Sequence, residues 1–350
     1  MNTEASAARS ALVTRRRLLQ TAAAGAVSLS GLALVGCGSA GSSGSTSSIN
    51  ISIVNASATG SLAAGRIMQA NGYFKRHGVT AKTTYVATGS QVAAALASGA
   101  ADLTVFSGLV SIMPAIAQGM QLKVLGGTEV VSTTALFSAE PGIGSIRDLK
   151  GQSIGVGAVG TELYDEAVAV LATVGLTASD VTFRNVGSSA ASFEAAMAKQ
   201  VGAGFGQIGD IGTAGKHGGH LITEIAQSLP LWIENGAVAS VAAVNNKRAG
   251  LVKTLAAYVD FFRFMTTDGS KQQYVNAFVA AGGDAVAGEG EWTFIHDHQA
   301  YSVSLDLPSA KMEFIQQQNV KNGAQKRVLS FSEYADTSVA ADAVKLAGSS

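Results

Sequence analysis

The sequence predicts an α/β protein of two lobes, in which mainly parallel sheets are flanked by helices and the chain crosses between the lobes twice. From residue 49 onward, short apolar segments rich in β-branched residues alternate with amphipathic segments. A Pro-Gly turn at 140–142 starts a second series of this kind, and an apolar run at 237–244 is placed to return the chain to the first lobe. Such alternation is typical of parallel sheets covered by helices.

The first lobe is expected to hold four strands separated by helices. The strands are expected at 49–56, 80–87, 101–106 and 122–127. Helices are expected at 62–78, from the Thr-Gly-Ser turn at 88–90 onward, and at 109–118. Apolar residues recur at helical spacing in these three segments, whereas the strands are β-branched and bounded by turn residues.

The second lobe is expected to contain strands at 152–157 and 181–187 and helices at 161–175 and 192–199. Eight glycines between 202 and 219 leave that stretch unassigned. Apolar residues from 251 to 265 follow one helical stripe, and further helices are expected up to the C-terminus. This pattern places 49–137 and 241–350 in the first lobe and 138–240 in the second.

Composition excludes several classes of protein. A chain of 350 residues suggests two domains or one large two-lobed unit, and 47% hydrophobic with 14% charged residues is typical of a folded protein. The 24 basic residues balance 24 acidic ones, so a nucleic-acid binder that depends on counterion release is not expected. A single cysteine excludes disulfide scaffolds, iron–sulfur clusters and cysteine-rich zinc sites. We expect a monomer without a cofactor.

The N-terminal segment predicts export. Three arginines at 15–17 precede an apolar stretch at 21–35, which is shorter than the ~20 residues that a membrane-spanning helix needs. A basic segment followed by a short apolar core is typical of a signal peptide, here expected over 1–36. The arginine-containing segment resembles the twin-arginine export signal, so we expect the protein to leave the cytoplasm by that route.

Cys37 is the candidate for lipidation. Residues 34–37 resemble a bacterial lipobox, in which the cysteine becomes the acylated first residue of the mature protein. A Gly/Ser-rich run follows, so 37–48 is expected to be a flexible tether between a lipid anchor and the folded part. A buried thiol is the alternative interpretation of a lone cysteine.

Three glycine- and hydroxyl-rich turns mark candidate binding segments, at 57–61, 88–90 and 157–161. Each follows a predicted strand and precedes a predicted helix. The unpaired N–H groups at a helix N-terminus bind small anions, and ligands of open α/β sheets bind beyond the carboxyl ends of the strands. Simple helix capping by Ser or Thr is the alternative for each turn.

Other patterns are weaker. The glycines of 155–160 have the GxGxxG form, but no acidic residue follows at the end of the next strand, as dinucleotide binding requires. Two histidine pairs, His217 with His220 and His296 with His298, have side chains that can bind a metal, but solvent-facing histidines are the commoner explanation and no metal site is expected. No GxSxG nucleophile turn occurs, and no catalytic residue is expected.

Four segments resemble the nitrate/sulfonate/taurine-type substrate-binding proteins of ABC importers. They are NGYFKRHGV at 71–79, GSQVAAALASGAADLTV at 89–105, AIAQGMQLKVLGG at 115–127 and IGSIRDLKGQSIGV at 143–156. The order and spacing hold over roughly 49–345. The resemblance implies a type II periplasmic-binding fold that closes on a small solute and delivers it to the permease subunits in the membrane.

The resemblance also implies a set of ligand-binding residues at the same turns. They are Ser57, Thr59, Gly60, Ser61, Gly89, Ser90, Ser107, Gly160, Thr161, Asp210 and Trp232. Relatives often carry an acidic residue in a Gly-x-Val-Asp-Ala segment, whereas 200–204 here lacks it and Asp210 comes later. Trp232 or Trp292 would cover an organic portion of the solute, although core packing is the default for a tryptophan.

The expected function is therefore an extracytoplasmic, membrane-anchored lipoprotein that captures a sulfonate, taurine, nitrate or an aromatic or pyrimidine-like solute. The lack of Arg or Lys in the candidate turns favours a neutral or weakly charged solute. A metal-binding or ligand-sensing lipoprotein is the first alternative. A pyrimidine-precursor synthase on the same fold is the second, but that class relies on a cysteine-rich segment that this chain lacks.

Overall fold

A computed structural model describes residues 48–348, which belong to one compact unit spanning 46–350. The predicted signal peptide over 1–36, Cys37 and all but the last residue of the predicted tether at 37–48 lie outside the described residues. Within 48–348, no helix is both long and apolar enough to cross a membrane.

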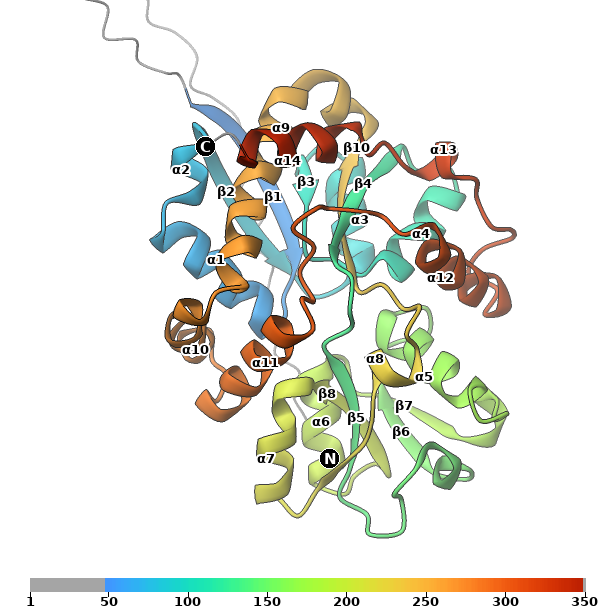
Figure 1. The fold of residues 1–350 in the computed structure, drawn as a ribbon. Coiled ribbons are helices and arrows are strands. Elements are labelled where there is room, and N and C mark those ends of the chain that lie inside the picture. Colours follow the sequence, from blue (N-terminus) through green and yellow to red (C-terminus); the bar gives the residue numbers. More distant parts are fainter. Residues whose placement is uncertain (1–47, 349–350) are drawn as a thin grey trace, which may run out of the picture. The chain divides into compact units, whose positions relative to one another are not determined.

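The first lobe is built on a five-stranded sheet (Figure 1). Its strands, in spatial order, are β2 (Val79–Val86), β1 (Ile49–Ala56), β3 (Leu103–Thr104), β10 (Asn235–Ser240) and β4 (Leu122–Glu129). The helices of the first part of the chain are α1 (Thr59–Ala70), α2 (Tyr73–Arg76), α3 (Gly89–Ala97) and α4 (Leu109–Ala117). Those after β10 are α9 (Val241–Met265), η4 (Asp268–Ser270), α10 (Lys271–Ala280), α11 (Ala285–Asp297), α12 (Ser309–Lys321), α13 (Phe331–Tyr334) and α14 (Ser338–Gly348).

The second lobe is built on another five-stranded sheet. Its order is β7 (Thr182–Asn185), β6 (Ser153–Val156), β8 (Ala203–Gln207), β5 (Thr134–Ser138) and β9 (His220–Glu224). Its helices are η1 (Ile146–Leu149), α5 (Glu162–Ala172), η2 (Ala178–Asp180), α6 (Ser189–Met197), η3 (Ile208–Asp210), α7 (Ile211–Lys216) and α8 (Ile225–Ser228). The predicted two-lobed α/β fold is confirmed.

Strand direction follows the chain crossings. In the first sheet β1 runs parallel to β2 and β3, whereas β10 is antiparallel to both β3 and β4. In the second sheet β6 runs parallel to β7 and β8, whereas β5 is antiparallel to β8 and β9. Four strands of each sheet therefore share one direction. The exception in each sheet is the strand that arrives from the other lobe.

The crossings lie at 130–133, between β4 and β5, and at 229–234, between α8 and β10 (Figure 1). The predicted boundary at 137/138 falls inside β5, which pairs only within the second sheet. The predicted boundary at 240/241 falls after β10, which pairs only within the first sheet. Both crossings therefore come a few residues earlier in the chain than the pattern suggests.

Local chemistry explains where predicted elements begin and end. The predicted helix at 62–78 is interrupted, because Gly72 adopts a left-handed backbone conformation at φ 65° between α1 and α2. The predicted strand at 237–244 ends at Ser240, whose hydroxyl accepts a hydrogen bond from the Ala243 N–H at 3.1 Å and so caps α9. Residues 241–244 are helical for this reason.

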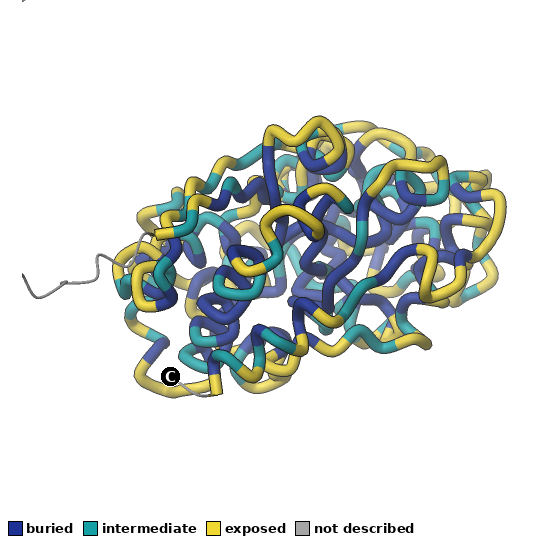
Figure 2. Tube along the Cα trace, turned by 90° about the horizontal axis from the view of Figure 1, so that it is seen from above, coloured by how far each residue is buried: buried dark blue, intermediate teal, exposed yellow. Residues whose placement is uncertain are grey.

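The core of each lobe lies between its sheet and its helices. In the first lobe, β1 and β3 pack with α1, α9 and α14, and Tyr258, Phe261 and Phe262 of α9 are buried there. A second cluster runs from α3 and α4 through the crossing at 229–234 to β6 and α5. Figure 2 shows the buried chain inside and the exposed loops around it. This packing holds the strand ends that line the cavity described next.

Candidate ligand cavity

A cavity of about 180 Å³ lies at the strand ends between the two sheets. The first lobe contributes residues 56–58, 60–61, 87–89 and 106–108, together with Ser111, Glu291 and Tyr301. The second lobe contributes 161–163, 187–189 and Gln207, and the crossings contribute Glu129, Thr133, Thr134, Glu234 and Asn235. Both lobes and both crossings therefore meet at one small space, as a site that closes on its ligand requires.

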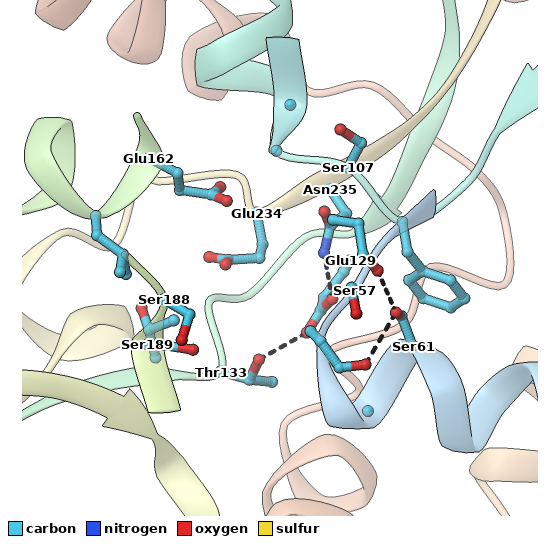
Figure 3. Close-up of a pocket in the computed structure, with 18 of the residues that line it drawn as sticks. Ser57, Ser61, Ser107, Glu129, Thr133, Glu162, Ser188, Ser189, Glu234 and Asn235 are labelled. Carbon is cyan, nitrogen blue, oxygen red and sulfur yellow. Dashed lines mark hydrogen bonds between the residues drawn. The ribbon is translucent and has the colours of Figure 1, made fainter. Parts of the chain in front are cut away.

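The turn after β1 is fixed by its own hydroxyl. Ser61 Oγ donates hydrogen bonds to the carbonyls of Ala56 at 2.5 Å and Ala58 at 3.1 Å (Figure 3). The backbone of 56–61 is thereby curled onto the start of α1. Ser57 and the N-terminal turn of α1 consequently face the cavity.

The loop after β3 depends on a buried asparagine. Asn55 Oδ1 accepts hydrogen bonds from the backbone N–H groups of Val105 at 3.0 Å and Phe106 at 3.1 Å, and from Thr104 Oγ1 at 3.2 Å. These bonds occupy the N–H groups of Val105 and Phe106, and β3 is shorter than the predicted strand at 101–106. The chain then places Ser107 at the cavity, fully buried and with no hydrogen-bond partner for its Oγ within the described chain.

The second lobe supplies hydroxyl and amide groups. Ser188 caps α6 by accepting a hydrogen bond from the Ala191 N–H at 3.2 Å, and Ser189 follows it at the cavity. Gln207 lies beyond β8 and contacts both Ser189 and Thr133 at 3.3–3.5 Å. Thr161 lies at the start of α5. These groups are neutral and can both donate and accept hydrogen bonds.

Four glutamates are the acidic groups of the polar lining. Glu129, at the end of β4, accepts hydrogen bonds from Thr133 Oγ1 at 2.9 Å and Asn235 Nδ2 at 2.6 Å (Figure 3). Burial raises the pKa of Glu129 to about 7 despite these two bonds. The backbones of the two crossings are joined beside it, because the Glu234 N–H donates to the Glu129 carbonyl at 3.1 Å.

The side chains of Glu234 and Glu162 both point into the cavity (Figure 3). Glu234 is 6% exposed, and burial together with the nearby Glu129 raises its pKa to about 8. Glu162 begins α5, and burial and then the Glu234 charge raise its pKa well above the ordinary value. Glu234 Oε2 and Glu162 Oε1 are buried atoms with no hydrogen-bond partner within residues 48–348.

Glu291 reaches the cavity from α11. It is 3% exposed and accepts a hydrogen bond from Tyr274 Oη at 2.7 Å, while its Oε2 has no partner among the described residues. Burial raises its pKa to about 8. A Cβ at Gly60 would overlap the Glu291 carboxylate, so this glycine lets α1 approach the acid closely.

No lysine, arginine or histidine is among the described residues that line the cavity. The apolar part of the lining comes chiefly from the rings of Phe106 and Tyr301, whose centroids are 5.8 Å apart. The site therefore combines four carboxyl groups, several hydroxyls and two aromatic rings. These groups can bind hydrogen-bond donors and positively charged groups. The described lining has no basic side chain that could bind an anion.

The structure brings six of the eleven residues expected from the sequence to the cavity. They are Ser57, Gly60, Ser61, Gly89, Ser107 and Thr161. The other five, which are Thr59, Ser90, Gly160, Asp210 and Trp232, are not among its lining residues. Three of those five are immediate neighbours of lining residues in the same turns. Asp210 and Trp232 are different, because Asp210 stabilises a turn and Trp232 packs in the hydrophobic core.

Asp210 closes the turn after β8. Its Oδ2 accepts a hydrogen bond from the Gln207 N–H at 2.8 Å, which starts η3. Trp232 is 1% exposed and packs in the cluster around β6 and α5. Trp292 is also buried, and its Nε1 donates to Ser270 Oγ at 2.7 Å. The expected aromatic cover therefore comes from Phe106 and Tyr301 and not from either tryptophan.

The histidines lie apart from the cavity. His220 contacts the Ile143 carbonyl at 2.7 Å, and His217 ends α7. His296 lies 2.8 Å from the carboxylate of Asp297 and stacks on Trp292, whereas His298 lies against Phe294. Within 48–348, no three His, Cys, Asp or Glu residues are grouped so that they could hold a metal ion.

The acids at the cavity were missed by the sequence reasoning. Glu162 directly follows Thr161, and the Ser188–Ser189 pair follows a predicted strand as the recognised turns do, so both had a readable signal. Glu129 and Glu234 lie at the crossings, whose exact positions in the chain could not be predicted from the sequence. Glu291 comes from a C-terminal helix about 230 residues after the turn it faces. No local pattern connects such distant positions.

Residues 59–222 match the family model described as NMT1/THI5 like. The match runs from α1 to β9 and therefore includes strands of both sheets. A comparison with curated proteins finds no match. The resemblance drawn from the sequence segments is thereby confirmed for this part of the chain.

Solved structures show the same fold. The periplasmic sulfonate-binding protein SsuA from Methylobacillus flagellatus superposes with a TM-score of 0.67 at 16% identity, covering 86% of this chain and 95% of that chain. The periplasmic nitrate-binding protein NrtA from Synechocystis PCC 6803 gives 0.64 at 11% identity, covering 85% and 89%. The fold is that of periplasmic binding proteins, as the sequence predicts.

The fold also occurs in an enzyme. The desulfurization enzyme DSZB superposes with a TM-score of 0.60 at 14% identity, covering 85% of this chain and 99% of that chain. Fold alone therefore does not separate binding from catalysis, whereas the residues of the cavity can.

Proposed function

We propose that this chain is the extracytoplasmic solute-binding protein of an ABC importer, which captures a small solute between its lobes and delivers it to permease subunits. The observation that carries the proposal is the cavity between the two sheets, which both lobes and both crossings line. A solute that contacts both lobes stabilises the closed arrangement over the open one. The closed form then presents matched lobe surfaces to the permease.

In this proposal the turns expected from the sequence hold the solute. The lining residues Ser57, Ser61, Gly89, Ser107 and Thr161 offer hydroxyl and backbone N–H groups, and Phe106 and Tyr301 pack against its apolar part. No bond is broken, so the solute leaves as it entered. The protein acts as a monomer, and a metal-binding role gains no support from the separated histidines.

Anchoring by Cys37 is part of the same proposal. The lipobox-like segment predicts that Cys37 carries lipid, and the Gly/Ser-rich tether would let the binding domain reach the permease. We expect wild-type protein to incorporate labelled fatty acid and to fractionate with membranes. Cys37→Ser should lose the label and be released in soluble form, and retention of both properties would contradict lipidation at this residue.

The decisive experiment is a thermal-unfolding screen of the purified protein against sulfonates, taurine, nitrate, aromatic acids, pyrimidines, amines and divalent metals. A ligand at 100 times its dissociation constant adds about 2.7 kcal/mol of stability, which raises the midpoint by several degrees. Mass spectrometry of the recovered solute should show it unchanged, whereas a converted product would indicate an enzyme. Stimulation of permease ATPase activity by the loaded protein would separate import from sensing.

A further inference from the structure

The cavity holds buried polar atoms that no group in the described chain satisfies. Glu162 Oε1, Glu234 Oε2, Glu291 Oε2 and Ser107 Oγ are buried atoms without a partner. Ser107, Glu234 and Glu291 are 0%, 6% and 3% exposed, so water in bulk does not compensate them. A buried polar group that lacks a partner costs about 1–3 kcal/mol, and more when it is charged. Such a group in a ligand cavity points to the missing ligand.

The acids approach the cavity from separate places. The Glu162 carboxyl lies against Gly108, just before α4, whereas the Glu291 carboxyl lies against Gly60 in the first turn of α1. Glu234 faces the same space as Glu162 (Figure 3). Among the described residues these acids do not group as a metal site, and acids at separate places suit a ligand with charge at two points.

Positive charge from the protein does not neutralise these acids. The described lining has no Lys, Arg or His. Lys271 pairs with the exposed Glu289 of α11, and Lys247 pairs with Asp102 at 2.8 Å. Burying several carboxylates without a cation is unfavourable, which is why the pKa values of these groups are raised.

We propose that the solute is a small organic cation with N–H donors at two separated points, as in a short diamine protonated at both ends. One ammonium group would bind between Glu162 and Glu234, and the other would bind at Glu291, with the hydrocarbon part against Phe106 and Tyr301. An ammonium group has three donors and no acceptor, so it satisfies the unpartnered oxygens directly. This inference rests on the proposed solute-binding function and narrows its substrate class.

The size of the cavity is compatible with such a solute. A cavity of about 150 Å³ accommodates a benzene molecule, so 180 Å³ is sufficient for a short diamine. Sulfonate and nitrate would find no cation among the described lining residues, and each glutamate that ionised beside them would add an uncompensated like charge. Taurine is disfavoured at its sulfonate end for the same reason.

The test compares binding of defined probes to the full-length purified protein by calorimetry and thermal shift. The probes are 1,4-diaminobutane, 1,5-diaminopentane, butylamine, choline, taurine, methanesulfonate, nitrate and a neutral aminopyrimidine. We expect the diamines to bind at least tenfold more tightly than butylamine, and choline, which has no N–H, to bind more weakly than either diamine. Tighter binding of an anion or a neutral compound would overturn the cation inference and leave solute binding intact. Binding of none of them would overturn the cation inference, and silence across the wider screen above would overturn solute binding as well.

Variants separate a role in binding from a role in folding. We expect Glu234→Gln and Glu291→Gln each to weaken diamine binding at least tenfold while the apo protein unfolds at the same or a higher temperature. An amide of the same shape stays neutral in the apo protein but cannot ionise beside a bound ammonium group, so a purely structural carboxyl group would not show this combination. Glu313→Gln is the matched control, because Glu313 is exposed on α12. Unchanged diamine affinity in both cavity variants would overturn the proposal.

Discussion

Among single residues, Gly108 illustrates how the two lobes come into contact. It precedes α4 with φ −56° and ψ 119°, a conformation open to any residue. A Cβ at this position would nevertheless overlap the carboxylate of Glu162, which belongs to the other lobe. Glycine at position 108 therefore leaves room for Glu162 of the other lobe. Its backbone conformation does not require a glycine.

We expect Gly108→Ala to fold normally and to bind its solute about tenfold more weakly, because the added methyl group opposes closure. Solute-induced compaction in small-angle X-ray scattering should also be smaller than in wild type. Gly142→Ala is the control, since a Cβ there meets no atom within 4 Å. Wild-type compaction and affinity in Gly108→Ala would show that the Glu162 contact does not limit closure.

The residues of the cavity were only partly accessible to sequence reasoning. Hydroxyl turns such as 57–61 and 88–90 are local features, and they could be found because a strand and a helix flank them. Asp210 and Trp232 were chosen by position in the chain, but they cap a turn and fill a core. The acid Glu291 faces Gly60 only because α10 packs against α1 and α11 packs against α10, and a single sequence does not contain that information.

At the scale of elements, β-branched strands flanked by clear turns were predicted to within a few residues, as β1 and β2 show. Short or glycine-rich elements were not, so β5, β9 and α7 went unassigned. The apolar run at 237–244 contains the end of a strand and the start of a helix without a change in hydrophobicity. Only the Ser240 cap marks the boundary, and it could have been read from the sequence.

The two crossings are held together by one side chain from α12. Lys311 Nζ donates hydrogen bonds to the Val130 carbonyl at 2.6 Å and to the Trp232 carbonyl at 3.2 Å. Each carbonyl belongs to a different crossing, and these segments carry the hinge in the proposed closure. Lys311 therefore connects the two crossings to each other.

We expect Lys311→Met to lower the unfolding midpoint by several degrees and to increase hydrogen exchange at 130–133 and 229–234. Hydrogen bonds from a charged donor contribute about 1.5–3 kcal/mol, and methionine keeps most of the apolar packing of the stem. Lys321→Met, at the exposed end of the same helix, is the control. If exchange rises equally throughout the protein, Lys311 is a general stabilising residue and not a hinge contact.

For the molecule as a whole, the family resemblance and the fold agree, but neither determines the charge of the solute. The turns that resemble the family suggested a site for a neutral or weakly charged group. The carboxyl groups come from the crossings, from α5 and from α11, so the electrostatic character of the cavity exists only once the whole chain is folded. This character has a consequence for stability that can be measured without knowing the solute.

The pH dependence of stability should be the reverse of the usual acid denaturation between pH 5 and 8. Burial raises the pKa of Glu234 and Glu291 to about 8 and of Glu129 to about 7, from 4.5. The groups facing them from the elements around the cavity are Glu162, Asp165 and Glu166 of α5, Asp210 of η3 and Tyr274 of α10. All of these are acidic or neutral, so none favours ionisation.

The folded protein therefore binds more protons than the unfolded chain throughout this interval, and stability falls as pH rises. We expect the apo protein to unfold several degrees lower at pH 8 than at pH 5.5, and Glu234→Gln to flatten this slope. Glu313→Gln should leave it unchanged. Diamine binding should have the opposite trend, with tighter binding and proton release as pH rises, because the bound cation favours the ionised carboxylates. An apo midpoint that rises from pH 5.5 to 8 would mean that the cavity acids are already ionised at pH 5.5.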